Sequence, residues 1–406
     1  MTGGRPTAPR QVTLVLCLPD GTLLGALPPY DVAFPYWPEA ADVVARAHEL
    51  YGVDVTVLRL LTAHAEREVA GGPVTYLAQV PRRPDADLVP WAGEDPLAPH
   101  RLRQTWAEPG GPDRDLAWAD GVLVGRGTPR VGPAWQVRTW NLSSLWRLPT
   151  ADGAVWLKVV PPFFAHEGAM LARLPADVVP PVVAADGPRV LLAEVAGDDQ
   201  YDAPLDRLLR MPPLLVGVQV GWVGRVQELL RIGLPDWRAT ALGAAAEGTL
   251  DRAASGLGRD VVKAVSRLLS GLTDRMAEVM SCGIPDTLVH GDFHPGNVRG
   301  TDDRLVLLDW GDCGVGHPLL DEAAFVERLS PSDRATVLAA WARLWRDAVP
   351  GCEPERAGAL LRPVAALRQA VIYDTFLAQI EPSERVYHAP DPAMWLTRAA
   401  DLTDPP

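Results

Sequence analysis

The sequence predicts an α+β protein with more than one domain, and three observations support this fold class. Strand-like and helical patterns alternate over residues 1–80. A second group of strand-like runs lies between residues 131 and 197, and from residue 198 to 406 the pattern is mainly helical. The intervening residues 81–130 are rich in proline and glycine, which is typical of a linker. A chain of 406 residues is long enough for two or three such domains.

The first 80 residues contain the signals of a small α+β domain. The run "QVTLVLCLPDGTLLGALP" has two apolar segments around a Pro-Asp-Gly turn, which predicts a β-hairpin. A helix is expected in "WPEAADVVARAHELYG", where Pro38 suits the first turn and Gly52 suits the C-terminal cap. The runs "VDVTVLRLL" and "PVTYLAQV" then predict two strands.

This order of elements resembles the Nudix fold, in which a helix ending in Glu-Glu-x-Gly precedes a Gly-Val-x-Val strand. The carboxylate pattern with which that family holds magnesium is replaced here by "ARAHEL". Only Glu49 falls in place, and Arg46 stands where a carboxylate is needed. One carboxylate beside an arginine cannot form a magnesium site. The resemblance therefore implies a degenerate, catalytically inactive domain, with a role in binding or packing or with none.

Residues 131–197 predict a sheet with one helix. The runs "WQVRTWNLSSLWRL" and "GAVWLKVV" are strand-like, "FFAHEGAMLARL" has helical spacing, and "PPVVAADGPRVLLAE" contains two further short strands. The helical region that follows, residues 198–406, is interrupted by "VHGDFHPGNVRGTDDRLVLLDWGD" at 289–312. There two histidines, five aspartates and an asparagine are crowded near glycines between apolar runs.

Composition excludes several classes of protein. The net charge of −13 argues against nucleic-acid binding, which needs clustered basic residues. An acidic surface is compatible with a cationic substrate and also serves solubility alone. No apolar run approaches the roughly 20 residues of a membrane span, and the N-terminus has no apolar signal core, so we expect a cytoplasmic protein with no membrane partner. The four scattered cysteines form no CxxC pair and suggest neither a zinc site nor a disulfide framework.

Lysine is rare in this chain, because Lys158 and Lys263 are the only lysines among 38 basic residues. Lys263 lies in a run with apolar residues at helical spacing, which predicts a solvated position on a helix. Lys158 lies in the strand-like "AVWLKVVPP". A functional role for Lys158 and a strand-edge position without function are both open from the residues alone.

The polar stretch contains the residue types that phosphoryl transfer requires. Transfer from ATP needs one carboxylate to orient the attacking hydroxyl and oxygen ligands to hold magnesium at the phosphates. Asp292 is followed five residues later by Asn297, and Asp309 comes after the apolar run "LVLL". This spacing matches the catalytic loop and the metal-binding aspartate of protein kinases.

In the form "HGDFHPGN…LLDWGD", the stretch resembles the aminoglycoside phosphotransferase and choline kinase-like family, and the resemblance extends over residues 131–406. It implies a two-lobed, protein-kinase-like phosphotransferase fold preceded by the small α+β domain. It implies ATP and Mg²⁺ as cofactors and a small-molecule hydroxyl acceptor as partner. Asp292 would be the catalytic base that orients the hydroxyl, and Asn297 and Asp309 would hold the metal.

The same resemblance implies an ATP-binding pair upstream. Lys158 would reach the phosphates, and Glu167 on the following helix would hold it. Arginine does not easily replace a compact ammonium group between phosphate oxygens and a carboxylate, which would explain a lysine at this position.

Two further segments occupy positions that contact the nucleotide in that family. The turn "TWNLSSLW" stands at the nucleotide-covering loop, so Ser143 and Ser144 would contact phosphate oxygens, although a plain β-turn explains the residues equally well. The run "LLAEVAG" stands at the hinge between the lobes, where the backbone of Glu194 and Ala196 would meet adenine.

Other polar residues near the motif have supporting roles or several open ones. His290 and His294 would brace the loop, because magnesium favours oxygen ligands over histidine. Asp321 would anchor the active-site loops. Asp312 is compatible with a carboxylate behind the metal ligands, a contact to a substrate amine, or a solvated turn residue.

The acceptor is the least determined part of the prediction. The acidic surroundings of the motif suit an amine-bearing alcohol of the aminoglycoside or amino-alcohol type. Tyr373, Asp374 and Glu381 are candidate substrate contacts, with an ordinary exposed helix face as the simpler explanation. The alternative to an enzyme is a nucleotide-binding pseudokinase with a sensor or scaffold role, and the intact Lys158 and Asp292 count against it. A Nudix-type hydrolase is excluded because the carboxylates that would hold its magnesium are missing.

Overall fold

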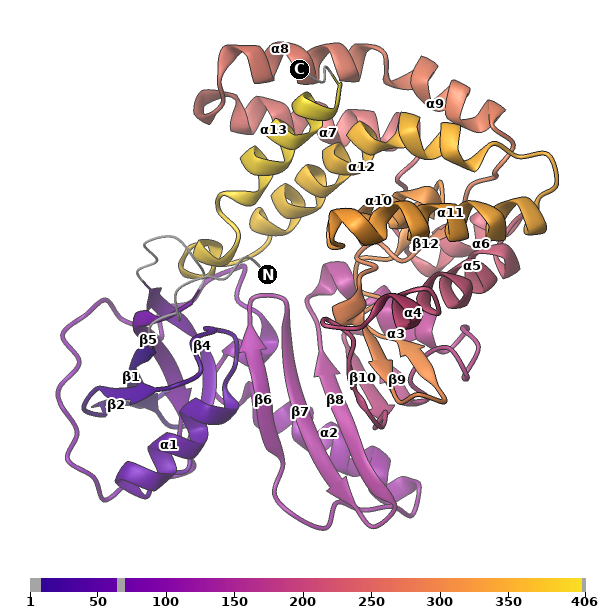
Figure 1. Cartoon of the computed structure of the whole chain (residues 1–406). Helices are drawn as coiled ribbons and strands as arrows, with labels where there is room; N and C mark the ends of the chain where they lie inside the picture. Colours follow the sequence, from indigo (N-terminus) through magenta and orange to yellow (C-terminus); the bar gives the residue numbers. More distant parts are fainter. Residues whose placement is uncertain (1–8, 64–69, 404–406) are drawn as a thin grey trace. The chain divides into compact units, whose positions relative to one another are not determined.

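The computed structural model describes residues 9–63 and 70–403 of the chain (Figure 1). These residues form two compact units. Unit 1 contains the described residues up to Ala165, together with Val182–Glu194 and Leu377–Ala389. Unit 2 contains the remainder, from His166–Pro181 through Val195–Phe376 to the last helix. Helices and sheets are both present, as expected for an α+β protein.

The N-terminal part of unit 1 is a mixed five-stranded sheet. Its strands are β1 (Arg10–Cys17), β2 (Leu23–Ala26), β3 (Tyr30–Val32), β4 (Thr56–Ala63) and β5 (Gly72–Gln79). The order is β2-β1-β5-β4, with β3 also on β1; β1 and β5 are parallel and the other pairs antiparallel. Helix α1 (Ala41–Tyr51) ends at Gly52, whose positive φ of 64° suits glycine. The expected hairpin, helix and two strands are therefore present, and the Nudix resemblance stays a prediction.

The second sheet of unit 1 is antiparallel. Its strands are β6 (Trp135–Trp140), β7 (Ser143–Thr150), β8 (Gly153–Val159), β9 (Val182–Asp186) and β10 (Arg189–Ala193), in the order β6-β7-β8-β10-β9. The short helix η2 (Pro162–Phe164) follows β8, and α3 (His166–Leu171), the next helix along the chain, belongs to unit 2. These are the strands and the helix that the sequence predicts between residues 131 and 197.

The segment 81–130, expected to be a linker, contains regular structure. It includes η1 (Thr105–Ala107) and the long helix α2 (Gly111–Gly125). Ala119 and Leu123 on α2 are fully buried in one apolar cluster with Trp146 and Leu157 of the second sheet. The helix was missed because the surrounding proline and glycine residues dominate the composition, while one apolar face with helical spacing is enough for packing.

The sequence suggested that the C-terminal half of the chain is one continuous region. The structure instead divides it between the two units. Residues 377–389, with η5 (Pro382–Tyr387), belong to unit 1. The Leu60 amide donates a hydrogen bond to Oε1 of Glu384 at 2.9 Å, and Arg103 donates two to the carboxylate of Glu381 at 2.9 and 3.0 Å. Tyr387 is buried in the core of the N-terminal sheet. The exposed helix face expected for Glu381 is therefore wrong, because its partner Arg103 lies far away in sequence.

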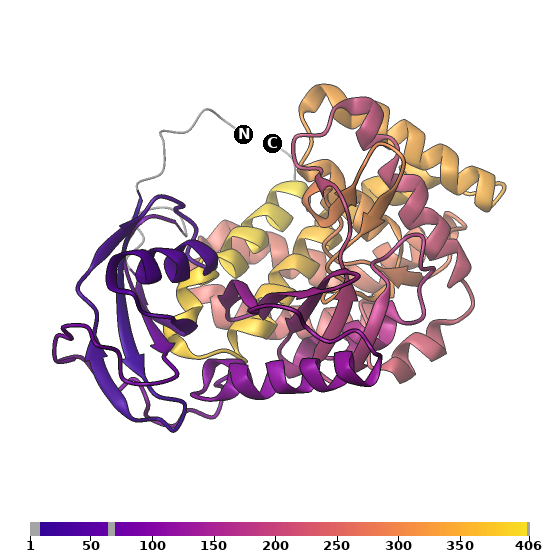
Figure 2. The same cartoon turned by 90° about the horizontal axis from the view of Figure 1, so that it is seen from below.

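Unit 2 is mainly helical. Its helices are α4 (Leu205–Leu208), α5 (Met211–Gly221), α6 (Val226–Ile232), α7 (Ala239–Ala253), η3 (Ala254–Gly256), α8 (Arg259–Ser270), α9 (Leu272–Ser281), α10 (Leu319–Glu327), α11 (Pro331–Ala348), α12 (Pro354–Leu377, whose last residue is counted in unit 1) and α13 (Asp391–Thr403). Helix α13 packs against α7 and α8, and these helices lie side by side in both views (Figure 1, Figure 2). Among the residues that the structure describes, no helix has the length and apolar character needed to cross a membrane.

Short strands interrupt the helices of unit 2 at the polar stretch. They are β11 (Asp198–Asp199), β12 (Thr287–Val289), β13 (Val298–Gly300), β14 (Leu305–Leu307) and β15 (Gly314–Gly316), with η4 (Pro295–Asn297) before β13. β12 pairs with β15, and β13 lies between β11 and β14. The apolar side chains of β12 and β14 are buried, so the two ladders fix the backbone on both sides of the candidate site.

Candidate active site

The loop that follows β12 requires a glycine at its second position. Gly291 has a φ of 96°, which L side chains rarely adopt. A Cβ atom at this position would lie 2.0 Å from the carbonyl oxygen of Asp312 and 2.9 Å from Nη2 of Arg368. The loop backbone therefore runs directly against the segment that follows Asp309.

Asp321, at the start of α10, anchors this loop. Its carboxylate is fully buried and accepts hydrogen bonds from the backbone amides of His290 and Gly291, both at 2.8 Å. Nε2 of Gln219 donates a third hydrogen bond, also at 2.8 Å. Burial raises the pKa of Asp321 to about 6, and the charge of Arg368 and the two backbone hydrogen bonds act in the opposite direction. The anchoring role that the family resemblance implied for Asp321 agrees with these contacts.

Arg368 on α12 holds the same loop from the other side. Its side chain is fully buried, and Nη2 donates a hydrogen bond to the carbonyl oxygen of Gly291 at 2.8 Å. Burial lowers the pKa of Arg368, while the carboxylates of Asp321, Asp312 and Asp292 raise it. We did not identify Arg368 from the sequence. A signal was available, because it is a charged residue within the apolar run "VAALRQAVI".

Asp292 is oriented by two neighbours. Nδ1 of His294 accepts a hydrogen bond from the Gly296 amide at 3.0 Å, which assigns the ring proton to Nε2, and Nε2 lies 3.5 Å from Oδ2 of Asp292. Nδ2 of Asn297 donates to the carbonyl oxygen of Asp292 at 2.8 Å and to Oδ2 at 3.1 Å. The Asp292 side chain remains 38% exposed. The carboxylate is thus held in place and still accessible.

Electrostatics keep Asp292 ionised. Burial raises its pKa, but the hydrogen bond from His294 and the charge of Arg328 outweigh burial and lower the pKa to about 2. A group with so low a pKa is a weak base at neutral pH. Asp292 is therefore suited to orienting a hydroxyl group as a hydrogen-bond acceptor.

Asn297 and Asp309 are brought together by the ladder of β13 and β14. Val298 pairs with Leu307, and the Leu308 amide donates to the carbonyl oxygen of Asn297 at 2.8 Å. Asp309, the next residue, is exposed and has a φ of 58°, the only positive φ of a non-glycine residue among those described. Such a conformation is costly and is often found at functional positions.

The chemistry of this pair fits magnesium. The Asn297 side-chain nitrogen is used by Asp292, so its amide oxygen is the atom left for a cation. Asp309 supplies an exposed carboxylate. Magnesium is bound in this way by one or two protein oxygens together with water and phosphates. Within residues 9–63 and 70–403 no group of three or more His, Cys, Asp or Glu side chains is placed to hold a metal ion.

His290 connects the two halves of the site. Its side chain is fully buried, and its Nε2 donates to the carbonyl oxygen of Leu308 at 2.9 Å. The imidazole packs on the indole of Trp310 with ring centroids 4.5 Å apart. Burial lowers the pKa of His290 to about 4, so the ring is neutral at pH 7. His290 therefore links the loop of Asp292 to the segment of Asp309, as a bracing residue should.

Glu167 and Lys158 belong to different units. Glu167 on α3 is buried in unit 2, and its Oε1 accepts a hydrogen bond from the Trp310 amide at 3.1 Å. Lys158 lies on β8 of unit 1, paired with Leu145 on one side and Val190 on the other. The predicted pairing of Lys158 with Glu167 at a nucleotide stays a prediction.

The two serines of the predicted nucleotide-covering loop are buried in unit 1. Oγ of Ser143 accepts a hydrogen bond from the Trp140 indole at 3.1 Å, and Oγ of Ser144 accepts one from the Trp146 indole at 2.9 Å. The hydroxyl oxygens therefore already have partners, and their contact with phosphate stays a prediction.

The predicted hinge residues follow the end of β10. The backbone amide of Glu194 donates to the carbonyl oxygen of Ala154 at 3.1 Å, and its carboxylate forms an ion pair with Arg147 at 2.7 Å. Ala196 is exposed in unit 2, after Val195, whose carbonyl oxygen accepts from Arg299 at 2.9 Å. The contact of Glu194 and Ala196 with adenine stays a prediction.

Two of the candidate acceptor contacts have structural partners. Asp374 accepts a hydrogen bond from Thr249 at 3.0 Å and forms an ion pair with Arg252. Glu381 pairs with Arg103 in unit 1. Both carboxylates are therefore used within their own unit.

Tyr373 is the third candidate acceptor contact, and the charge of Asp292 acts on it. Its pKa is raised by burial and by the carboxylates of Asp391, Asp292 and Asp312, while Arg328 lowers it. Three carboxylates of unit 2 therefore act on the Tyr373 phenol in the same direction as burial.

Comparisons with known proteins concern the segment that contains this site. The sequence pattern of APH, described as the Phosphotransferase enzyme family, matches residues 162–358. No curated protein matches the chain. Choline kinase from Cryptosporidium parvum Iowa II is similar in structure with a TM-score of 0.52 and 9% identity, over 71% of this chain and 96% of that chain. This likeness shows the fold and nothing about substrate.

Two further solved structures are similar to this chain with lower TM-scores. Macrolide 2'-phosphotransferase MphH from Brachybacterium faecium has a TM-score of 0.45 and 17% identity, over 71% of this chain and 98% of that chain. A choline/ethanolamine kinase family protein from Mesorhizobium loti has a TM-score of 0.48 and 16% identity, with the same coverage.

The matched segment contains Asp292, Asn297, Asp309 and the loop anchors Asp321 and Glu167. The fold is that of the kinase-like phosphotransferases. Residues 162–358 of this chain therefore carry the sequence pattern of the phosphotransferase enzyme family.

Proposed function

We propose that the protein transfers the γ-phosphoryl group of ATP to a hydroxyl group of a small molecule. The observation that carries this proposal is the arrangement around Asp292. Its accessible carboxylate is held by His294 and Asn297, in a loop that His290 ties to the segment of Asp309. Phosphoryl transfer depends mainly on positioning and on charge stabilisation, and this arrangement serves both.

The reaction converts ATP and an alcohol into ADP and a phosphate ester. Asp292 accepts a hydrogen bond from the acceptor hydroxyl, orients its oxygen towards the γ-phosphorus and takes the proton as the new P–O bond forms. Asn297 and Asp309 would hold Mg²⁺, which supplies neutralisation of phosphate charge when bound. Lys158 would contact the phosphates, with Glu167 as its partner.

The surroundings of Asp292 favour an acceptor that carries an amine. The carboxylates of Asp391, Asp292 and Asp312 all act electrostatically on Tyr373, so the charge in this part of unit 2 is negative. Carboxylates attract an ammonium group and disfavour an anionic acceptor. We therefore infer an amino alcohol or an aminoglycoside-like acceptor.

The test is ADP release by the full chain with Mg²⁺, ATP and a set of amine-bearing and amine-free alcohols. We expect ADP formation that depends on an amine-bearing acceptor, that stops on removal of Mg²⁺, and that is lost in Asp292→Ala. Asp303→Ala is the matched control, because Asp303 is an exposed aspartate in the same stretch. ATP binding without turnover of any acceptor would contradict the proposal and favour a pseudokinase.

A further inference from the structure

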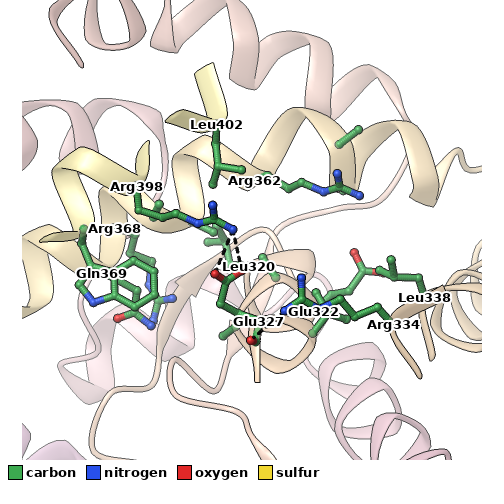
Figure 3. Close-up of a pocket in the computed structure, with 18 of the residues that line it drawn as sticks. Leu320, Glu322, Glu327, Arg334, Leu338, Arg362, Arg368, Gln369, Arg398 and Leu402 are labelled. Atoms are coloured by element: carbon green, nitrogen blue, oxygen red, sulfur yellow. Dashed lines mark hydrogen bonds and ion pairs between the residues drawn. The ribbon is translucent and has the colours of Figure 1, made fainter. Parts of the chain in front are cut away.

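A cavity of about 280 Å³ lies among α10, α11, α12 and α13 of unit 2 (Figure 3). Its wall includes Leu320, Glu322, Arg362, Arg368, Trp395 and Arg398. Asp292, Asn297 and Asp309 are not part of this wall. Such a volume is at the lower end of the range for pockets that bind small molecules. The cavity is thus distinct from the candidate active site.

Glu322 is the unusual side chain of this wall. The residue is 6% exposed, and its carboxyl group makes no hydrogen bond or ion pair with any residue that the structure describes. A buried carboxyl group without a partner is energetically costly. Gly358 on α12 leaves space for it, because a Cβ atom there would lie 2.8 Å from Oε2 of Glu322. The carboxyl group is therefore accommodated in the cavity wall but has nothing to bind.

The charged groups around Glu322 come from all four helices. Arg362 and Glu355 on α12 act on it directly. Arg334 on α11 also lines the cavity, and Arg398 on α13 is neutralised by an ion pair with Glu327 on α10 at 3.0 Å, drawn as dashed lines in Figure 3. Burial raises the pKa of Glu322 to about 8, which the charge of Arg362 only partly offsets.

Hydrogen-bond donors without partners lie on the same wall. Arg362 is exposed at the cavity and forms no hydrogen bond or ion pair with a described residue. Nε1 of Trp395 is buried and has no acceptor within the described part of the chain. The cavity thus combines one unmatched carboxyl group with an unmatched guanidinium and an indole N–H. A ligand with only one charge would leave one side of this set without a partner.

We propose that this cavity binds a small zwitterion, with the ligand's ammonium group on Glu322 and its carboxylate on Arg362 and Trp395. A guanidinium and an N–H donor are suited to a carboxylate, and a buried carboxylate is suited to an ammonium group. The site goes beyond the proposed phosphotransferase function. Binding can be measured without ATP, so failure of one proposal leaves the other standing.

Binding should be linked to proton release. In the empty cavity Glu322 is protonated over much of the range below its raised pKa, and an ammonium group favours the ionised form. Affinity should therefore rise as the pH increases towards 8, and at neutral pH each binding event should release close to one proton.

The experiment is isothermal titration calorimetry of the full chain with glycine, β-alanine, γ-aminobutyrate and δ-aminovalerate, each tested in two buffers of different ionisation enthalpy. Butyrate and n-butylamine are the singly charged controls. We expect at least one amino acid to bind with proton release, and both controls to bind at least ten-fold more weakly.

Variants locate the binding at the cavity. Glu322→Gln and Arg362→Gln should each weaken binding at least ten-fold, and Glu322→Gln should also remove the proton release. Glu247→Gln and Arg343→Gln change exposed residues outside the cavity and should leave affinity unchanged. The proposal is wrong if none of the four amino acids binds at millimolar concentration, if Glu322→Gln binds normally, or if n-butylamine binds as tightly as the amino acid. If Glu322→Gln does not fold, the unmodified chain still tests the proposal. Weak binding of butyrate and n-butylamine together with proton release on binding of an amino acid would support it, and the absence of either would contradict it.

Discussion

Asp321→Asn is the most direct test of how the active-site loop is held. The change keeps the shape of the side chain but replaces one carboxylate oxygen with an NH₂ group. Oδ1 accepts from Gly291, and Oδ2 accepts from His290 and Gln219. In either orientation of the new amide, at least one buried backbone N–H faces a donor. One unsatisfied buried donor costs about 1–3 kcal/mol, so we expect a loss of about 2 kcal/mol in the free energy of unfolding.

The assay combines urea unfolding, followed by circular dichroism, with the ADP-release measurement at the same pH. Because the lost hydrogen bond holds the loop of Asp292, we expect turnover to fall more than ten-fold even where the protein is fully folded. Asp274→Asn is the matched control, because Asp274 is exposed on α9. An Asp321→Asn protein that unfolds at the same urea concentration as the unmodified chain, with the same kcat, would refute this account of the loop.

Three further predictions follow from individual contacts. Gly291→Ala should lower the melting temperature and abolish ADP release, because its Cβ would meet the Asp312 carbonyl at 2.0 Å; a normal melting curve would contradict the loop geometry. Asp309→Ala should abolish Mg²⁺-dependent ADP release, whereas Asp312→Ala should cost less, and equal losses would mean that the metal carboxylate is assigned too narrowly. Burial raises the pKa of Glu384 from 4.5 to about 7, so the folded state holds this proton more tightly and stability should fall between pH 4.5 and 7, by about 3 kcal/mol. Glu384→Gln keeps an acceptor for the Leu60 amide and should lose this part of the pH dependence. Urea unfolding of both proteins between pH 4.5 and 7 is the measurement. The same change in the free energy of unfolding with pH in both proteins would contradict the prediction.

The sequence predicted the parts of the protein that local patterns determine. Strand-like runs identified β1, β2, β4 and β5 of the first sheet and the five strands of the second, but not the short β3, and the spacing of Asp292, Asn297 and Asp309 marked the loop. Asp321 was expected as an anchor, and its hydrogen bonds agree with this role. These features depend on residues close together in sequence or on a motif of fixed spacing.

The missed features depend on contacts between distant segments. Arg368 holds a loop that lies 77 residues earlier, and nothing in its own helix shows this partner. Helix α2 was hidden by the proline and glycine content around it. Glu322 looked like any acidic residue at the start of a helix, and its burial depends on the packing of α11, α12 and α13.

The membership of residues 377–389 in unit 1 has a consequence for how the chain is made. The hydrogen bond between Leu60 and Glu384 spans 324 residues. At about 5–20 residues per second, the ribosome needs on the order of tens of seconds between the two. During that time the N-terminal sheet lacks Tyr387 in its core, and Arg103 lacks its carboxylate partner. Unit 1 is therefore completed late in synthesis, and shortening the gene from its 3′ end removes part of the first domain along with the last helix.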